Sequence, residues 1–308
     1  MRSPIGAAAT FAGTIAAAMA LGFGPLVVSA EEILGTAPAY ATRAPGGLGA
    51  DRLPNEAAIT RRIWAPGLDD GFVPQGVTLQ EGAIYLGAYQ SADRDKSRGA
   101  CRVFRIDPET GNVTATLDLP PSCGHAGGAA KGAPGRIWIV DTHVMFEVEL
   151  ANDDRNRLGH VVREVALAAP LKGSFAAGDG HALWLGGYVR DRPGRLYRVP
   201  LVAIEGASIG ASKAEASLEL PTRAQGAAID PAGRLWVTRS GSALGELLRL
   251  DPGTGAVQGR FVMPDGIEDA GFDGAGMLWS VSEAGSRRWS NWATHFPMVF
   301  RIDPARLR

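Results

Sequence analysis

Five copies of one segment type, spaced by about 48 residues, occupy most of this 308-residue chain. Each copy centres on one aromatic residue in an alternating apolar stretch, and successive aromatic residues are 53, 46, 52 and 43 residues apart. These residues are Tyr85, Trp138, Trp184, Trp236 and Trp279. A period of this length is typical of the blades of a β-propeller, each of which is a sheet of four strands.

A second segment follows each aromatic strand and has the pattern of the third strand of a blade. Three of its copies, 103–107, 247–251 and 299–303, end in arginine, an aliphatic residue and aspartate. Apolar and polar residues alternate in these copies, as they do in a half-buried strand. Turn residues follow, and then the expected fourth strands, which are 113–120, 161–170, 215–221 and 256–264.

The fifth copy reaches only its third strand before the sequence stops at Arg308. A matching strand pattern stands at 58–65, directly before the first copy. Pairing of this strand with 298–303 would close the ring and remove both open sheet edges. The sequence therefore predicts an all-β fold, a single five-bladed β-propeller over 58–308 that is closed by its N-terminal strand. A sixth blade would need about 50 further residues.

The N-terminus has the pattern of a secretory signal peptide over residues 1–30. Arg2 is followed by an uncharged run rich in Ala, Gly, Val and Leu, which ends in the small-x-small site Val28-Ser29-Ala30. We expect cleavage after Ala30, or as late as Ala41, and an extended lead-in over 31–57. An uncleaved membrane anchor is the alternative, because the run is long enough to span a bilayer. With cleavage, the mature chain has no membrane span and is secreted or periplasmic.

Charge and cysteine content restrict the partners and the compartment. The 31 basic and 32 acidic side chains give a formal net charge of −1, which leaves no electrostatic case for a nucleic acid partner. The two cysteines, Cys101 and Cys123, are expected to form one disulfide in an oxidising compartment. Two buried free thiols are the alternative. We expect the mature protein to be a monomer.

Polar residues recur at one place of the repeat, where the chain leads into the innermost strand. They are Gln75, His125, Ser174, Gln225 and Glu268. Because equivalent positions of a propeller meet at one end of the central channel, we expect these side chains at one opening. They either bond to neighbouring backbone groups and channel water or converge on a ligand or ion. Burying them without partners would cost about 1–3 kcal/mol each.

A histidine and carboxylates at one opening are suited to general acid–base catalysis or to a weak divalent cation site. We therefore expect catalytic roles for His125, Glu268 and Glu283. The further residues expected to contact a ligand are Gln75, Gln90, Asp141, His143, Ser174, Gln225 and Asp269.

The connections between the second and third strands are expected to reach the same face. Loop 87–101 is long and charged, and loop 282–297 contains Trp289, Trp292 and His295, which we also expect to contact a ligand. Aromatic and arginine side chains in an irregular segment are typical of ligand or protein contacts. A lid that packs over its own blade is the alternative.

Two of the repeats resemble a known superfamily of propellers. Segments 225–238 and 272–283 are similar to blades of the SMP-30/gluconolactonase, NHL-repeat and streptogramin-lyase proteins. In the streptogramin lyases a strand of this kind supplies a metal-binding glutamate, which Glu283 matches, although the lyases' histidine two residues later is Gly285 here. The lactonases hold a divalent cation through an acid that Glu268 matches. The resemblance implies the fold and one divalent cation, calcium or magnesium, held by Glu268 or Glu283.

The sequence thus leads to two candidate functions. In the first, an exported propeller binds a small organic ligand at the channel mouth and acts as a metal-assisted hydrolase, of lactonase type, or as a lyase. In the alternative, a non-catalytic binding or scaffold protein uses loops 87–101 and 282–297 against another exported protein.

Overall fold

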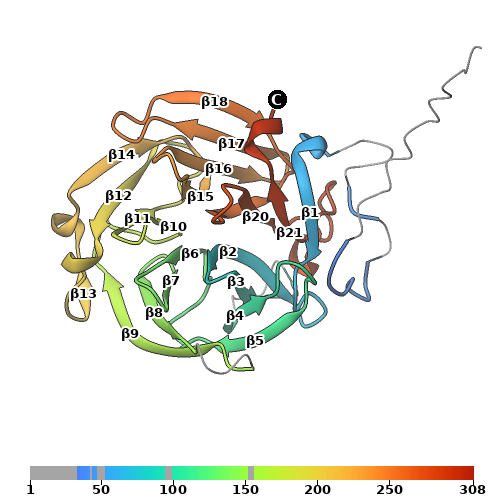
Figure 1. Ribbon diagram of the computed structural model, residues 1–308, viewed down its shortest axis with the longest axis horizontal. Coiled ribbons are helices and arrows are strands. Elements are labelled where there is room, and N and C mark those ends of the chain that lie inside the picture. The colour runs from blue at the N-terminus through green and yellow to red at the C-terminus, as the bar shows by residue number, and fades with distance from the viewer. Residues whose placement is uncertain (1–32, 42–43, 47–52, 94–98, 152–155) are drawn as a thin grey trace, which may run out of the picture. The chain divides into compact units, whose positions relative to one another are not determined.

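The computed structural model describes residues 33–41, 44–46, 53–93, 99–151 and 156–308. The predicted signal peptide therefore lies outside the described residues. Within them, five sheets follow one another around a ring, and in four of the five the strand that comes first in sequence lies nearest the centre (Figure 1). No helix in this part of the chain is long and apolar enough to cross a membrane.

Four blades take their strands from consecutive sequence. The first contains β2 (Phe72–Gln80), β3 (Ala83–Gln90), β4 (Cys101–Ile106) and β5 (Val113–Asp118). The second contains β6 (Gly128–Lys131), β7 (Arg136–Val140), β8 (Val144–Leu150) and β9 (Gly159–Leu167), with the short β13 (Ser208–Ile209) beside β9. The third contains β10 (Phe175–Gly178), β11 (Ala182–Gly186), β12 (Gly194–Pro200) and β14 (Ala216–Leu220). The fourth contains β15 (Ala224–Ile229), β16 (Leu235–Gly241), β17 (Leu244–Leu250) and β18 (Val257–Val262).

The fifth blade is built from both ends of the described chain. It contains β19 (Ile267–Phe272), β20 (Leu278–Ser282), β21 (Met298–Ile302) and β1 (Ile59–Trp64). β1 pairs antiparallel with β21, with Ile63 opposite Val299, so the predicted closure of the ring is confirmed. The helices of the described residues are 3-10 turns, namely η1 (Glu56–Ala58), η2 (Leu201–Ala203), η3 (Ala211–Lys213), η4 (Arg287–Trp289) and η5 (Pro304–Arg306).

Two boundaries differ from the sequence expectation. Residues 87–90 are the end of β3 rather than part of a loop, because their backbone continues to pair with β4. The lead-in also contributes to the sheet: the Leu34 N–H donates to the Arg62 carbonyl, and the Leu34 carbonyl accepts from the Trp64 N–H, each at 3.0 Å. Leu34 therefore continues the fifth blade outward beyond β1 by one bridge.

The recurring arginine of the third strand has a structural role. Across the strand pairs, Arg198 lies opposite Trp184, Arg249 opposite Trp236, and Arg301 opposite Trp279. Each guanidinium lies 5.8–5.9 Å from the centre of its tryptophan ring, within cation–π range. In the third, fourth and fifth blades the repeated Arg and Trp of the sequence are thus one cross-strand pair.

The disulfide between Cys101 and Cys123 is present, with the two Cα atoms 5.9 Å apart, so the predicted pairing is confirmed. It joins the start of β4 to the segment that leads into the second blade. Such a bond points to an oxidising compartment.

Replacing both cysteines with serine is expected to lower the free energy of unfolding by about 2–3 kcal/mol, because the bond closes a separation of 22 residues. Urea unfolding of the oxidised protein and of the C101S/C123S variant measures this difference. Wild-type protein kept under dithiothreitol should unfold like the variant. Coincident unfolding curves for oxidised wild type and variant would contradict the expectation.

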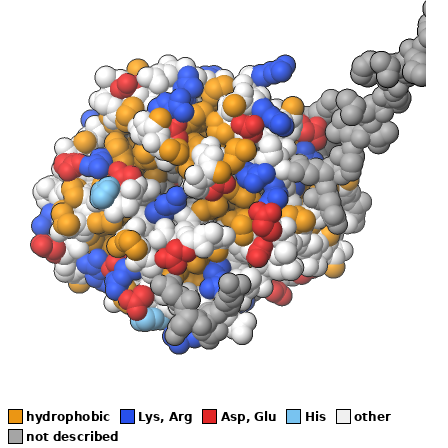
Figure 2. Space-filling model, viewed as in Figure 1, with side chains coloured by type: hydrophobic (Ala, Val, Ile, Leu, Met, Phe, Trp, Pro, Cys, Tyr) orange, Lys and Arg blue, Asp and Glu red, His pale blue; other side chains and the backbone are white. Residues whose placement is uncertain are grey.

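Charged side chains are mixed over the surface. On the face drawn in Figure 2, basic and acidic side chains of the described residues are interspersed among hydrophobic ones. This distribution agrees with the formal net charge of −1.

Candidate functional site

A cavity of about 650 Å³ lies where the loops leading into the innermost strands meet the connections between second and third strands. Every blade contributes to its lining, as the equivalence of these positions predicts. It brings together seven of the residues expected from the sequence, which are Gln75, His125, Ser174, Gln225, Glu283, Trp289 and Trp292. Glu268 is 1% exposed and lies behind them, bonded to Gln225 and Ser240.

β-bulges aim the polar side chains of three inner strands. The strand register shifts at 74–77 in β2, at 224–226 in β15 and at 267–270 in β19. A bulge re-aims a side chain at the end of a strand. Two of these bulges contain a glycine, Gly76 and Gly226, because the neighbouring blade lies close. A Cβ atom at either position would lie 2.5 Å from a backbone atom of the adjacent inner strand.

Glu268 and Glu283 are neighbouring buried carboxyl groups, and Glu283 lines the cavity. The Glu283 Oε2 atom accepts from Gln75 Nε2 at 2.9 Å and from Trp289 Nε1 at 2.7 Å. Glu268 Oε1 accepts from Gln225 Nε2 at 3.3 Å. Since Glu283 lines the cavity and Glu268 does not, Glu283 is the member that a ligand can reach.

Burial favours the protonated form of both carboxyl groups. Burial raises the pKa of Glu283 to about 7, although the hydrogen bonds that it accepts from Trp289 and Gln75 oppose the shift. Burial and the adjacent Glu283 charge raise the pKa of Glu268 well above its ordinary value. Two neighbouring carboxyl groups cannot both ionise cheaply, so the pair is expected to keep at least one proton at neutral pH.

The Gln75 amide has one bonding position to spare. Its Nε2 donates to Glu283 and to the Pro74 carbonyl, and the side chain is fully buried. Its Oε1 is buried and has no hydrogen-bond donor among the described residues. Gln75 lines the cavity, but this oxygen is itself shielded from solvent.

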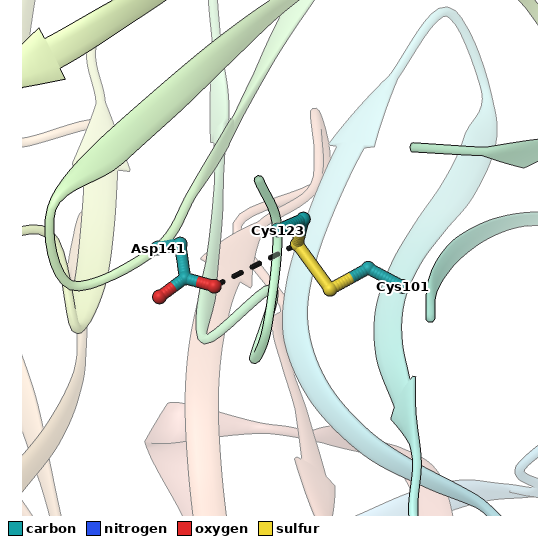
Figure 3. Close-up of side chains that lie close together, drawn as sticks. All are labelled: Cys101, Cys123 and Asp141. Carbon is teal, nitrogen blue, oxygen red and sulfur yellow. Dashed lines mark hydrogen bonds between the residues drawn. A yellow bond between two sulfur atoms is a disulfide. The ribbon is translucent and has the colours of Figure 1, made fainter. Parts of the chain in front are cut away.

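Asp141 fixes the loop that carries His125. Its carboxylate accepts from the backbone N–H groups of Gly124 at 2.8 Å and His125 at 2.6 Å. Figure 3 shows this carboxylate beside the disulfide, with Asp141 Oδ2 3.7 Å from Cys123 Sγ. The His125 ring packs against Tyr89, with ring centres 5.2 Å apart.

Among the described residues, one group has the spacing of possible metal ligands. Its three side-chain atoms, from Cys101, Cys123 and Asp141, lie within 4.8 Å of one another. Both sulfur atoms are in the disulfide and carry no thiolate, so this group does not bind a metal.

Four other expected residues lie away from the cavity lining. Gln90 is exposed and donates to the Asp70 carbonyl, and His143 is exposed on the turn between β7 and β8. His295 is 5% exposed and packs near Trp64, with ring centres 6.2 Å apart. Asp269 faces the interior of the channel.

Asp269 joins the inner strands of the ring to one another. Its carboxylate accepts from the backbone N–H groups of Ala129 at 2.8 Å, Val77 at 3.3 Å and Ala227 at 3.4 Å. These donors belong to β6, β2 and β15, so one side chain of β19 holds three other blades. Burial raises the pKa of Asp269, and the backbone donors oppose the shift.

Aromatic side chains form one wall of the cavity. Trp289 and Trp292, from the turn around η4, are half-buried, with ring centres 4.9 Å apart. Tyr89, at the end of β3, lies in the same lining. The tryptophans therefore face the cavity, as expected of ligand contacts.

The remaining lining was not predicted as a site. It includes Thr142, Lys172, Tyr188, Arg190, Arg223 and the segment 240–242. Lys172, Tyr188 and Arg190 come from the third blade and Arg223 from the start of the fourth. The sequence could have indicated Tyr188 and Arg190 only through their position in the repeat. Segment 187–193 connects the second and third strands of its blade, as loops 87–101 and 282–297 do in theirs.

Comparison with known proteins confirms the class of fold. No protein-family model matches the chain. No curated protein matches its sequence. Among solved structures, glutaminyl cyclase from Myxococcus xanthus is 11% identical, with a TM-score of 0.54 over 80% of this chain and 94% of that chain.

Two of the propellers expected from the blade patterns also match. Streptogramin B lyase is 15% identical, with a TM-score of 0.36 over 80% of this chain and 97% of that chain. Regucalcin from Agrobacterium tumefaciens is 14% identical, with a TM-score of 0.39 over 78% of this chain and 93% of that chain. The chain is a five-bladed β-propeller, and at this identity the likeness to the glutaminyl cyclase shows the fold alone.

Proposed function

We propose that this propeller binds a small organic molecule in the channel-mouth cavity and transforms it by proton transfer at Glu283, as a hydrolase or lyase. The observation that supports the proposal is the pair of neighbouring buried carboxyl groups, Glu268 and Glu283, of which Glu283 lines the cavity. A general base is most effective when its pKa lies close to the working pH, and the pKa of Glu283 is about 7.

In a hydrolysis, Glu283 accepts a proton from the attacking water as the water oxygen bonds to the acyl carbon. The proton then passes to the leaving oxygen as its bond to the acyl carbon breaks. Gln75 and Trp289 hold the Glu283 carboxylate in place through their hydrogen bonds to Oε2. Protonated Glu268 stabilises the ionised form of Glu283 by donating a hydrogen bond to its carboxylate.

A divalent cation is compatible with the same oxygen atoms. Calcium and magnesium take carboxylate oxygens, and Glu283, with Glu268 behind it, would hold such an ion. The ion would polarise a substrate carbonyl. Assays with EDTA, and with calcium or magnesium restored, separate the metal-assisted reaction from the reaction that uses proton transfer at Glu283 alone.

The test is a hydrolysis panel of lactones, esters and amides, with an N-terminal glutaminyl peptide included because a glutaminyl cyclase shares the fold. For any compound that is turned over, Glu283→Gln should lower kcat by about a hundredfold or more, because the amide cannot accept the proton. Glu164→Gln, on an exposed position of β9, should leave kcat unchanged. Turnover that survives Glu283→Gln would contradict the proposal.

We also propose that the chain is exported and cleaved after Ala30 rather than after Ala41. Residues between the two sites contact the ring: Leu34 bridges to β1, and the Tyr40 hydroxyl donates to the Gly285 carbonyl at 3.1 Å. Cleavage after Ala41 would remove both contacts. N-terminal sequencing of the protein purified from the periplasm or medium should therefore begin at Glu31, and a start at Thr42 would contradict this.

A further inference from the structure

Three cationic side chains line the cavity, and all three surround the connection between β11 and β12. Arg190 lies on that connection, and the Arg223 N–H donates to the Val189 carbonyl at 2.7 Å. Lys172 is adjacent to its start, since a Cβ on Gly187 would lie 3.1 Å from Lys172 Cβ. One side of the cavity therefore carries Lys172, Arg190 and Arg223.

None of these cations forms an ion pair with a described residue. Glu283 is the acidic residue among the described residues that line the cavity. Three positive side chains against one carboxyl leave the cavity with an excess of positive charge even when Glu283 is ionised. Cations gathered in this way repel one another, and an anion between them relieves the repulsion.

The backbone and side chain of Arg223 are held in a defined position. Arg223 has a φ of 62°, the left-handed region in which residues other than glycine are uncommon. Its N–H bonds to Val189 and its carbonyl accepts from the Ser240 N–H at 3.1 Å. The guanidinium lies over Gly241, where a Cβ would be 3.0 Å from Nη1. Residues in this backbone region cluster at ligand sites.

The two sides of the cavity differ in chemistry. The third and fourth blades supply the cations, whereas the first and fifth supply Tyr89, Trp289 and Trp292. Glu283 comes from the fifth blade. A ligand that satisfies all of these groups has an anionic end and an apolar body.

We propose that the ligand is an organic anion, with its carboxylate or similar group at Lys172, Arg190 and Arg223 and its apolar body against Trp289 and Trp292. This places the reacting bond over Glu283. The inference names the substrate class of the proposed function and rests on the same cavity.

The test compares three compounds with one phenyl body and different charge: phenylacetate, phenylacetamide and 2-phenylethylammonium. Binding is followed by isothermal titration calorimetry and by quenching of tryptophan fluorescence. Phenylacetate is expected to bind about tenfold tighter than phenylacetamide, because it gains one charge-assisted contact. The ammonium compound should bind most weakly of the three. Added salt should weaken the binding of phenylacetate alone.

Variants of the cationic side chains test where the anion binds. Lys172 and Arg190 are exposed, so Lys172→Gln with Arg190→Gln leaves the fold intact. This pair should weaken phenylacetate binding about tenfold and phenylacetamide binding less than about twofold. Arg192→Gln is the matched control, because Arg192 is an exposed cation of the same connection outside the cavity lining. It should change neither.

Phenylacetate that binds no tighter than phenylacetamide, or not at all, would overturn the inference. So would an equal loss in the Arg192→Gln variant. Glu283→Gln separates this inference from the proposed function, since it should abolish turnover while phenylacetate binding stays at least as tight. If the Glu283→Gln variant still turns over substrate and still prefers anions, the proposed proton transfer at Glu283 is wrong and the anion site stands.

Discussion

Replacing Asp269 with alanine is expected to lower the free energy of unfolding by about 3–9 kcal/mol. The change would leave three buried backbone N–H groups without an acceptor, and each costs about 1–3 kcal/mol. Water cannot take the place of the carboxylate without entering the packed centre of the ring, where Asp269 is fully buried. Equilibrium unfolding in urea, followed by circular dichroism, measures the difference.

Asp251 offers the matched control. Its carboxylate also accepts from two backbone N–H groups, those of Gly253 and Thr254, but on an exposed hairpin turn. Asp251→Ala should therefore destabilise the protein far less than Asp269→Ala, because water satisfies the donors. If Asp269→Ala and Asp251→Ala destabilise the protein equally, the central carboxylate does not hold the blades together.

The free energy of unfolding is expected to fall by about 3 kcal/mol as the pH rises from 4.5 to above 7, through Glu283 alone. The pKa of Glu283 is raised from 4.5 to about 7 in the folded protein. The folded state thus keeps a proton that the unfolded chain has released, so this stability is fully present below pH 4.5 and lost as the pH passes 7. The raised pKa of Glu268 acts in the same direction.

Glu283→Gln should reduce this pH dependence, and the Glu268→Gln/Glu283→Gln double variant should reduce it further. The variants should gain stability relative to wild type at high pH, because no buried carboxyl has to ionise. Glu164→Gln should follow the wild-type curve, since Glu164 is exposed. Urea unfolding at a series of pH values tests this, and parallel curves for wild type and Glu283→Gln would contradict it.

The fold could be predicted from the sequence because each blade repeats a local signal. The alternation of β21 and the matching pattern of β1 were sufficient to predict their pairing across more than 230 residues. The arginine and tryptophan of the last three repeats were visible as patterns, but their cross-strand contact was not. That contact depends on strand register, which the repeat alone does not define.

The site could be predicted only in part. Gln75, Gln225 and Glu268 were found because they share a position in the repeat, and their bulges were not foreseen. Adjacent Glu268 and Asp269 were expected to act in catalysis and in ligand binding, yet Glu268 bonds to Gln225 and Ser240 behind the lining and Asp269 bonds to the backbone of three other inner strands. Single cations such as Arg190 and Arg223 look like ordinary surface residues until ring closure brings them to one cavity.

Glu268 and Glu283 are expected to keep at least one proton between them at neutral pH. Infrared spectroscopy measures it directly, through the carbonyl stretch of a protonated carboxyl group in a pH titration of the folded protein. We predict a protonated carboxyl that persists at pH 7, loses intensity above it, and is absent from the Glu268→Gln/Glu283→Gln double variant. A spectrum at pH 7 that is the same in wild type and double variant would contradict the account.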